Sequence, residues 1–500
     1  MSKETGSKLY LYGICGVAVI GGLLFGYDTA VISGAEQALQ NFFVAGIGPE
    51  YSNGSLGKYL HGFVTSSALI GCIIGGFISG AMASRFGRKI SLIISSVLFF
   101  LSALGSYMPE FLFRSDFSLY KPEESTYGVM WTFILYRILG GIGVGVASAL
   151  CPMYIAEISP AEIRGKLVSW NQFAIILGQL IVYFINTIIR SSLGSNADEI
   201  KVAMDRVGWR RMFVSEAFPA ALFGILLIFV PKTPRFLLLK NQPEKAKDVL
   251  TRINGAGKAE EIFEDIKDTI NNEKKEKLLS YGYKVIIVGV LLSFFQQAVG
   301  INSVLYFAPR IFESMGASSG DSMVQTVVMG VINILFTLVA IFTTDKLGRK
   351  PLLMVGSIGM ALGMAALSIL AFNTDTDKEM SKAVAILTLV FVIIYTASFM
   401  ASWGPMCWVL ISEIFPNTIR AAAVAIAVAA QWISNFGISF SFLALQDWSM
   451  GGTYLIYAFF SILSFIFVFK MVPETKNKTL EDMNALWRGI KNPQKGETKV

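Results

Sequence analysis

The sequence predicts an all-α membrane protein with twelve transmembrane helices, and three observations carry this prediction. Of the 500 residues, 54% are hydrophobic and only 15% are charged, too few charges to cover the surface of a soluble protein. Apolar runs of about 20 residues, the length that a helix needs to cross a bilayer, recur along the chain. Short motifs at the ends of these runs are repeated in the second half of the chain. Together they indicate two six-helix halves.

Twelve apolar runs are expected to cross the membrane. At about 20 residues per crossing, they fall at 10–32, 60–82, 89–108, 128–150, 167–189, 211–231, 284–308, 323–344, 351–372, 383–411, 420–445 and 452–472. No small-residue cleavage site follows the first run, so we expect it to remain in the mature protein. The four cysteines lie inside apolar runs without CxxC spacing, which indicates small buried hydrophobic residues and neither disulfides nor metal ligands.

The charges of the connecting loops predict that both termini are cytoplasmic, because short cytoplasmic loops collect Lys and Arg. The basic loop residues follow even-numbered spans, which all end on one side of the membrane: Arg85, Arg88, Lys89, Arg164, Lys166, Lys346, Arg349, Lys350 and Arg420. The loops at 33–59 and 373–382, on the other side, are neutral or acidic. The first of them carries Asn53-Gly54-Ser55, a glycosylation sequon short enough to arise by chance.

The chain divides into an N-terminal half at 1–232, a linker at 233–283, a C-terminal half at 284–472 and a cytoplasmic tail at 473–500. In the linker, apolar residues recur at helical spacing in a polar background. This pattern predicts short amphipathic helices beneath the membrane domain, with a flexible linker as the alternative. The net charge of +7 is assigned to cytoplasmic loops and not to a nucleic-acid surface.

An internal repeat relates the two halves. Three motifs recur in order: RFGRK (85–89) as KLGRK (346–350), AEISPAEIRG (156–165) as SEIFPNTIRA (412–421), and, more weakly, PKTPR (231–235) as PETKNKT (473–479). Glu157 and Arg164 precede Glu413 and Arg420 by the same number of residues, so the halves run in the same direction. Such a parallel duplication is typical of secondary transporters, whose halves move around a site near the bilayer midplane.

The apolar run at 284–309 contains three amides, Gln296, Gln297 and Asn302. An amide without a partner in hydrocarbon costs several kcal/mol, so these groups must face protein, water or a polar ligand. Gly300 and Pro309 loosen the backbone around them, which predicts a helix that breaks or bends beside a wet cavity. Amides both donate and accept, as a ligand made of hydroxyls requires. The alternative is that they only hold helices together.

Three ionisable residues lie inside the predicted spans: Asp28, Arg137 and Glu216. The directions of spans 1, 4 and 6 place all three in the outer half of the membrane. Asp28 and Arg137 are expected to pair. A charge inside a membrane is a functional candidate by default, and a static buried ion pair is the alternative.

The chain resembles the sugar porter family of the major facilitator superfamily over essentially its whole length. The motifs that carry this resemblance include GGLLFGYDTAVISG (21–34), RFGRK (85–89), PMYIAEISPAEIRGKLVS (152–169), NQFAIILGQ (171–179), QQAVGIN (296–302), WGPMCWVLISEIFPNTIR (403–420) and VPETKNKTLE (472–481). Ser84, Lys232 and Phe236 depart from the family pattern, which commonly has Asp, Glu and Trp at these positions. The resemblance implies the major facilitator fold.

The resemblance also implies which residues contact a sugar. At the matching positions these are Gln172, Gln179, Gln296, Gln297, Asn302, Asn333, Trp408 and Gln431. Physically, Phe25, Trp408 and Trp432 offer flat apolar surface to the C–H face of a sugar, and Tyr306 completes the expected site. The alternative for any single one of these residues is packing between helices.

In the family, Asp at the position of Asp28 marks proton-coupled members. We therefore expect protonation of Asp28 to release Arg137 and to couple proton entry to opening and closing, with Glu216 nearby. The resemblance further implies a cytoplasmic gate of salt bridges between the two halves. Its residues are Arg85, Arg88, Glu157, Arg164, Arg349, Lys350, Glu413 and Arg420.

The expected function is proton-coupled import of D-xylose across a bacterial inner membrane. The alternatives are a hexose or another pentose as substrate, an uncoupled facilitator, or a membrane sugar sensor. No nucleophile, base and orienting group occur together, so no enzyme is expected. We expect no cofactor apart from the proton as coupling ion, no metal, no nucleic acid, and function as a monomer in the lipid bilayer.

Overall fold

The computed structural model describes residues 6–46, 55–113, 119–160, 163–272, 277–373, 382–416, 418–476 and 487–488. Among these residues every regular element is helical. Twelve helical segments are long and apolar enough to cross a membrane, and each coincides with one of the twelve predicted spans. Asn53 of the sequon and tail residues 477–486 and 489–500 lie outside the described residues.

The N-terminal half contains α1 (Lys8–Ala30), α2 (Ile32–Leu39), α4 (Ser55–Arg85), α5 (Gly87–Tyr107), α6 (Tyr127–Ile158), α7 (Arg164–Ser191), α8 (Ala197–Ala203), α9 (Trp209–Val214) and α10 (Ala217–Phe229). The linker contains α11 (Pro234–Leu239), α12 (Pro243–Asn254) and α13 (Ala256–Asn272). The C-terminal half contains α14 (Tyr283–Ala298), α15 (Ile301–Tyr306), α16 (Ala308–Ser314), α17 (Ser319–Leu347), α18 (Arg349–Phe372), α19 (Lys382–Met400), α20 (Trp403–Glu413), α21 (Arg420–Trp448) and α22 (Met450–Met471).

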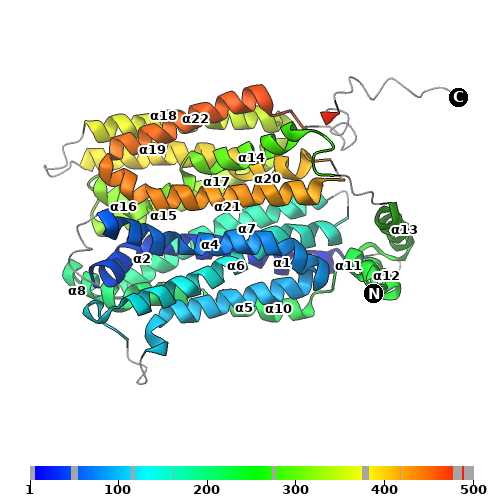
Figure 1. Ribbon diagram of the computed structural model, residues 1–500, viewed down its shortest axis with the longest axis horizontal. Helices are drawn as coiled ribbons and strands as arrows, with labels where there is room; N and C mark the ends of the chain where they lie inside the picture. Colours follow the sequence, from blue (N-terminus) through cyan, green and yellow to red (C-terminus); the bar gives the residue numbers. More distant parts are fainter. Residues whose placement is uncertain are drawn as a thin grey trace.

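The two halves lie side by side with their long helices roughly parallel (Figure 1). They meet where α4 packs on α21 and α7 packs on α17. These helices correspond in the internal repeat: α4 and α17 are the second spans of their halves, and α7 and α21 are the fifth. The duplication found in the sequence therefore also describes the interface between the halves.

The seventh span is broken where the sequence predicts it. Helix α14 ends at Ala298, Gly300 follows with φ of +91°, and α15 begins at Ile301. A side chain at position 300 would meet the ring of Tyr457, and its backbone conformation favours glycine. The break is therefore fixed both by packing and by the backbone.

The first and sixth spans are longer than the sequence predicts. Residues 33–45, expected in a loop, continue the first span through α2 and a π-helical stretch, Gln40–Ala45. A second π-helical stretch, Met204–Gly208, leads into α9. Phe42 and Phe43 pack against Trp209, with ring centroids 5.2 and 5.6 Å apart. Polar residues of the two π-helical stretches also contact each other, because the Asn41 amide donates to the Asp205 carboxylate over 3.0 and 3.1 Å.

The linker forms the short amphipathic helices that its spacing predicts. On α12, Val249, Leu250 and Ile253 are buried. Helices α11, α12 and α13 gather at one end of the bundle (Figure 1), which we call the linker end, and the opposite end we call the far end. The Ser7 backbone N–H, just before α1, donates to the Arg252 carbonyl over 3.1 Å and ties the first span to α12.

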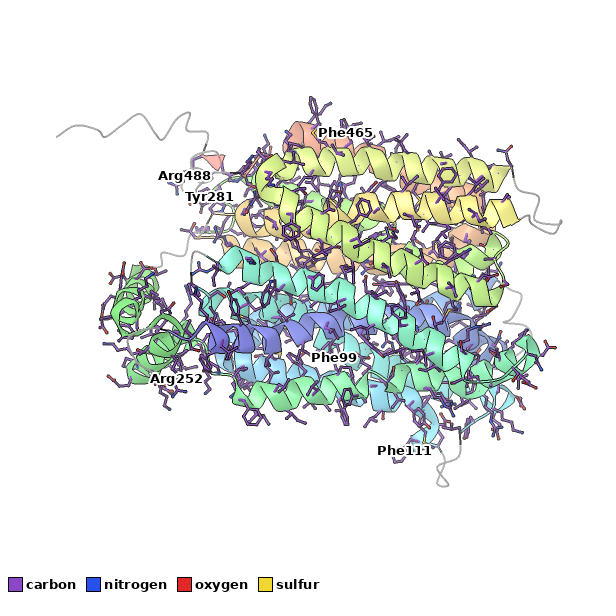
Figure 2. All side chains as sticks on the ribbon, turned by 180° about the vertical axis from the view of Figure 1, so that it is seen from behind. Phe99, Phe111, Arg252, Tyr281, Phe465 and Arg488 are labelled. Atoms are coloured by element: carbon purple, nitrogen blue, oxygen red, sulfur yellow. The ribbon has the colours of Figure 1, made fainter. Side chains whose placement is uncertain are left out.

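The linker end of the C-terminal half carries a further contact. Figure 2 shows Tyr281 and Arg488 together there, on the same end as Arg252, with Phe111 at the far end. The Arg488 guanidinium lies 4.9 Å from the centre of the Tyr281 ring. Next to it, the Trp487 indole donates to the Ile414 carbonyl over 2.9 Å. These contacts place tail residues 487 and 488 against the C-terminal half.

Candidate substrate-binding site

A cavity lies between the two halves and takes its lining from both. Ten of the eleven residues that the sequence analysis assigns to sugar contact line it: Phe25, Gln172, Gln179, Gln296, Gln297, Asn302, Tyr306, Trp408, Gln431 and Trp432. They come from α1, α7, α14, α15, α20 and α21. The structure thus brings residues far apart in the sequence to one place, while their contact with a sugar stays a prediction.

Glycines bring α1 and α7 close enough to share this cavity. A Cβ atom at Gly26 would collide with the Ile175 carbonyl, and one at Gly178 would collide with the Leu23 carbonyl. The two backbones therefore touch at matched positions. This close approach brings Phe25 on α1 beside Gln179 on α7 in the cavity wall.

The amides of the C-terminal half form a connected chain. The Asn302 amide donates to Gln297 Oε1 over 2.6 Å, and Gln297 donates to Gln296 Oε1 over 3.2 Å. Gln431 on α21 donates to the same Gln296 oxygen over 2.6 Å. Because α14 breaks at Gly300, amides on both sides of the break join one network.

Several polar atoms in the cavity wall lack a hydrogen-bond partner among the described residues. They are the Oε1 atoms of Gln179 and Gln431 and the indole Nε1 of Trp432. Buried polar atoms are normally paired, so unpaired ones that line a cavity indicate where a polar ligand binds. Two acceptors and one donor suit a ligand whose hydroxyl groups both donate and accept.

Aromatic side chains give the cavity an apolar wall as well. Phe25 of the N-terminal half and Trp432 of the C-terminal half have ring centroids 5.4 Å apart. Trp408 is half-buried beside the same cavity. Flat apolar rings next to amides match the two kinds of surface that a sugar ring presents.

Asn333 is the one predicted contact that does not line the cavity. It is buried on α17, and neither atom of its amide has a partner among the described residues. Asn435, which the sequence analysis missed, does line the cavity and donates to the Tyr306 hydroxyl over 3.5 Å. The sequence could have indicated Asn435, because this residue follows Gln431 by one helical turn and lies on the same face of the helix.

The three ionisable residues of the spans form one buried cluster. Arg137 donates to Asp28 Oδ1 over 2.5 Å and to the Asp28 carbonyl over 3.3 Å, as the sequence predicts. The guanidinium also lies 5.0 Å from the centre of the Phe213 ring. Glu216 is fully buried close to Asp28, and neither of its carboxylate oxygens has a partner among the described residues.

At the linker end, two pairs of predicted gate residues form ion pairs within their own halves. Arg88 donates to Glu157 over 2.6 Å, and Arg349 donates to Glu413 over 3.0 Å. In this structure these two pairs therefore do not bridge the halves, and bridges between the halves when the linker end closes stay a prediction. The reason is local, because each Arg begins a helix that packs on the helix ending at its Glu.

The remaining gate arginines also contact groups nearby in the sequence. Arg164 donates to the Ser159 carbonyl over 3.5 Å, and Arg420 donates to the Phe415 carbonyl over 3.2 and 3.1 Å. Each of these two arginines donates to the carbonyl five residues before it. Because Arg164 and Arg420 are matched in the internal repeat, the repeat preserves this contact. The Arg85 guanidinium lies over the ring of its neighbour Phe86. Each of these contacts stays within one half.

The far end contains polar contacts that join the halves, and the sequence analysis missed them. Arg310 on α16 donates to Glu36 Oε1 on α2 over 2.6 Å, and His61 on α4 contacts the same oxygen. Lys58 on α4 forms an ion pair with Asp447 on α21. The far end of this structure is therefore closed by pairs of residues from opposite halves.

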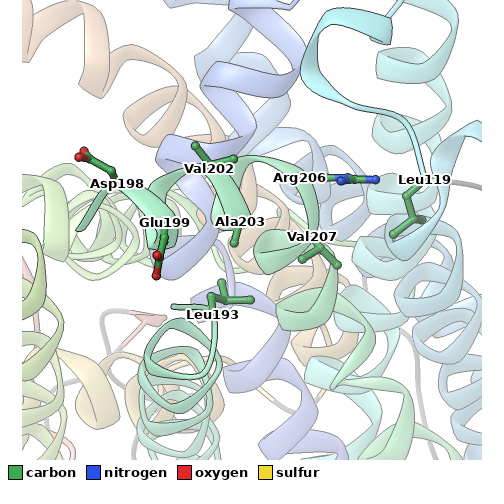
Figure 3. Close-up of a pocket in the computed structure, with 8 residues that line it drawn as sticks. All are labelled: Leu119, Leu193, Asp198, Glu199, Val202, Ala203, Arg206 and Val207. Carbon is green, nitrogen blue, oxygen red and sulfur yellow. The ribbon is translucent and has the colours of Figure 1, made fainter. Parts of the chain in front are cut away.

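A larger hollow lies at the far end, beside α8 and the π-helical stretch Met204–Gly208 (Figure 3). Leu193, Val202 and Val207 line it together with Asp198 and Arg206. All of its lining residues belong to the N-terminal half. Unlike the inter-half cavity, it does not combine unpaired polar atoms with facing aromatic rings.

Twelve spans in two related halves around a shared polar cavity define a membrane transporter with an internal repeat. The chain belongs to the family described as "Sugar (and other) transporter", whose sequence profile matches residues 14–487. It is an all-α protein with the major facilitator fold and crosses the membrane many times.

Named relatives agree with this membership. The chain is 48% identical to the D-xylose-proton symporter of Escherichia coli over 96% of each protein. It is 40% identical to a glucose transport protein of Synechocystis, over 96% of this chain and 98% of the relative. The inward-open structure of the E. coli xylose transporter XylE matches 95% of this chain and 100% of that chain, with a TM-score of 0.83 at 46% identity.

Proposed function

We propose that this protein is a proton-coupled sugar symporter that imports D-xylose by alternating access. The observation that carries the proposal is the inter-half cavity, with its amide chain and facing rings. The similarity to a D-xylose-proton symporter over nearly the whole chain supports the substrate and the coupling ion. The proposal places the chain in a bacterial inner membrane as a monomer, with no cofactor, no metal, no nucleic acid and no enzymatic chemistry.

The proposal orients the molecule with its linker end and both termini in the cytoplasm. The basic loop residues gather at the linker end, which is the arrangement expected for cytoplasmic loops. The far end then faces the outside. The division into halves at 1–232 and 284–472 follows the repeat, and we infer that these halves move as bodies.

Sugar binding follows from the chemistry of the cavity wall. The oxygens of Gln179 and Gln431 accept hydrogen bonds from sugar hydroxyls, and the rings of Phe25 and Trp432 cover apolar C–H groups. Each hydroxyl bond contributes about 0.5–1.5 kcal/mol net, since water offers the same bond. The resulting affinity is modest, which allows release after transport.

Proton coupling is assigned to Asp28, Arg137 and Glu216. Deep in the bundle, the Asp28 carboxylate is neutralised by Arg137 over 2.5 Å. A proton on Asp28 removes that negative charge, so Arg137 is released to its remaining contacts. The adjacent Glu216 carboxylate adds a second acceptor for the same proton. A protonation step is thereby tied to a rearrangement between α1 and α6.

The conformation supports alternating access. Ion pairs between the halves close the far end, whereas the ion pairs of the linker end lie within single halves. The similarity to an inward-open xylose transporter agrees with this arrangement. We infer that transport breaks the far-end pairs and brings the linker ends of the halves together.

A hexose such as glucose is the second candidate substrate, favoured by the 40% identity to a glucose transport protein. Xylose and glucose differ by one hydroxymethyl group. Such a difference is worth about 1–3 kcal/mol in a pocket, so the same wall could select either sugar. Uncoupled facilitation and sugar sensing remain alternatives that the test below separates.

The test is uptake of labelled D-xylose into proteoliposomes that contain the purified protein. We expect accumulation above equilibrium when a pH gradient is imposed, and its loss in Asp28→Asn with exchange of labelled for unlabelled xylose retained. Equilibration that ignores the gradient would identify a facilitator. Absence of xylose movement in both assays would overturn the proposal, and the same assays with D-glucose would then test the hexose.

A further inference from the structure

Three residues of the far end converge on one carboxylate oxygen. Glu36 Oε1 lies 2.5 Å from His61 Nε2 and 2.6 Å from Arg310 Nη1. Glu36 is 3% exposed and His61 is 1% exposed, whereas the Arg310 side chain is 31% exposed. Glu36 and His61 belong to the N-terminal half, and Arg310 belongs to the C-terminal half.

The contacts define the charge of this cluster in the closed far end. His61 Nε2 points at a carboxylate, so it carries a hydrogen. His61 Nδ1 is buried and has no partner among the described residues. A charged imidazole would place a second N–H there without an acceptor, which is costly. The cluster is therefore balanced by one carboxylate and one guanidinium, with a neutral imidazole.

Opening of the far end removes the positive charge of Arg310 from this cluster. Arg310 also donates to Gln40 over 3.1 Å, so α16 is held against the first span by two hydrogen bonds. When the halves separate, Arg310 leaves with α16, while Glu36 and His61 stay together. Without the guanidinium, the Glu36 carboxylate still favours a positive charge on the imidazole beside it, whereas the positive charge that opposed one is gone. A proton on the neighbouring imidazole supplies the missing positive charge, and its added N–H meets water at the opened end.

We propose that His61 and Glu36 form a proton-binding site at the far-end gate, where a proton from outside replaces Arg310 when the gate opens and is displaced when Arg310 returns. This inference rests on the alternating access of the proposed function, and it does not involve Asp28. The open gate binds one proton more than the closed gate. By linkage, acid therefore favours the open gate and alkali favours the closed gate.

Other charged groups of the far end have partners of their own. Lys58 pairs with Asp447 between α4 and α21. Arg190 on α7 donates to Ser319 over 2.7 Å, and Glu313 on α16 accepts from Ser322. Within the N-terminal half, Asp205 accepts from Asn41, and Arg210 pairs with Glu110. His61 is the single histidine of the chain, so a response that needs an imidazole isolates this cluster.

The first experiment measures the width of the far end against pH. Spin labels are attached to cysteines that replace the exposed Ser192 and Asn373, at the far ends of α7 and α18. The four native cysteines are buried. In lipid nanodiscs, we expect the fraction with the longer distance to rise at least about threefold between pH 8 and pH 5.5. In His61→Gln, which keeps a donor toward Glu36, we expect this rise to be lost.

Control variants separate this site from its neighbours. Lys58→Gln removes another inter-half ion pair of the far end, and we expect the pH response to persist in it. Asp28→Asn removes the contribution of the proposed coupling carboxylate, and we expect the part of the response that remains in it to be lost when His61→Gln is added. Glu36→Gln is the second variant should His61→Gln fail to fold, with the same expected loss. An unchanged response in His61→Gln or Glu36→Gln, or no response in the wild type, would overturn the inference.

A spectroscopic experiment tests the protonation itself. Because His61 is the single histidine, labelled histidine reports this imidazole alone in protein freed of any affinity tag. At pH 7 we expect a larger charged fraction in Arg310→Gln than in the wild type, and no such increase in Lys58→Gln. Equal fractions in the wild type and Arg310→Gln would overturn the inference. Failure of gradient-driven uptake would count against the proposed function only, because both readouts here work without transport.

Discussion

The two ends of the bundle are held together in different ways. At the far end, the ion pairs Arg310–Glu36 and Lys58–Asp447 join the halves. At the linker end, Arg88–Glu157 and Arg349–Glu413 join helices within a single half. Pairs within a half make that half rigid, and pairs between halves fix one end shut. The difference shows how one duplicated fold provides two rigid halves together with ion pairs that join them at one end.

A cross-link across the far end should have the largest effect, because it prevents the halves from parting there. Cysteines replacing Lys58 and Asp447 are joined by a short bifunctional thiol reagent. We expect D-xylose uptake to fall to background and to return when the linkage is cleaved. Cysteines at Lys247 and Glu260, an exposed pair within the linker, are the matched control, and their cross-link should leave uptake intact. Full uptake with the far end cross-linked would show that this end need not open.

Between the two ends, Gln296 holds the cavity wall of the C-terminal half together. Its side chain accepts from Gln297 and Gln431, and it donates weakly to the Trp403 and Gly404 carbonyls over 3.4 Å. Gln296→Ala removes these contacts and one expected contact to the sugar. At about 0.5–1.5 kcal/mol per hydrogen bond, we expect sugar affinity to fall about tenfold or more, measured by calorimetry. Unchanged affinity would place the sugar elsewhere.

At the linker end, Glu413→Gln should affect stability more than gating. Glu413 accepts from Arg349 of the same half and, over 2.6 Å, from Thr475 at the start of the tail. Loss of a charged hydrogen-bond partner costs about 1–3 kcal/mol. We expect the thermal midpoint to fall by a few degrees in detergent, with Glu260→Gln in the linker as the unaffected control. A change in far-end width without a change in the midpoint would contradict this account.

The smallest expected effect is a pH dependence at the same end. Burial raises the pKa of Glu474, but backbone N–H groups of Lys476, Arg349 and Lys350 donate to its carboxylate and hold the pKa below its usual value. A lowered pKa stabilises the folded state above the unfolded value of about 4.3, and this contribution is lost as pH falls through the folded value. The stability difference between wild type and Glu474→Gln should shrink in acid, as followed by thermal melts between pH 7 and pH 3.5. A stability difference that does not change with pH would show that Glu474 is not the source of this pH dependence.

The first half lacks this carboxylate cap, as the sequence indicates. Lys232 stands where the family commonly has Glu, and the Phe236 ring packs against Gly87 at the start of α5. The lysines that follow the two matched helix starts still agree, because Lys89 donates to the Ile228 carbonyl and Lys350 to the Phe469 carbonyl, both over 2.8 Å. The repeat therefore conserves some contacts at this end and replaces others.

The sequence predicts the parts of this structure that depend on local patterns. The twelve spans follow from apolar length, and the break at Gly300 follows from a glycine between amides in a membrane helix. The three amides of the seventh span could be named because polar groups inside a membrane need partners. The family resemblance added Gln172, Gln179, Asn333, Trp408 and Gln431.

The parts that the sequence analysis missed depend on contacts between distant segments. Glu36 lies in a stretch predicted as a loop and His61 at the start of the second predicted span, and only the fold shows that they meet Arg310 at the closed far end. Likewise, Arg88 and Glu157 have opposite charges, but the sequence does not say whether a charge pairs within its half or across the interface. The unpartnered amide of Asn333 is explained by nothing in the described residues.

The most direct test of the account measures both ends of the bundle in the same preparation. Spin labels at positions 192 and 373 report the far end, and labels at the exposed positions Ser84 and Lys346 report the linker end. On lowering the pH and adding D-xylose, we expect the far-end distance to lengthen while the linker-end distance shortens. Distances that lengthen or shorten together, or a change at one end alone, would contradict two rigid halves that alternate around the cavity.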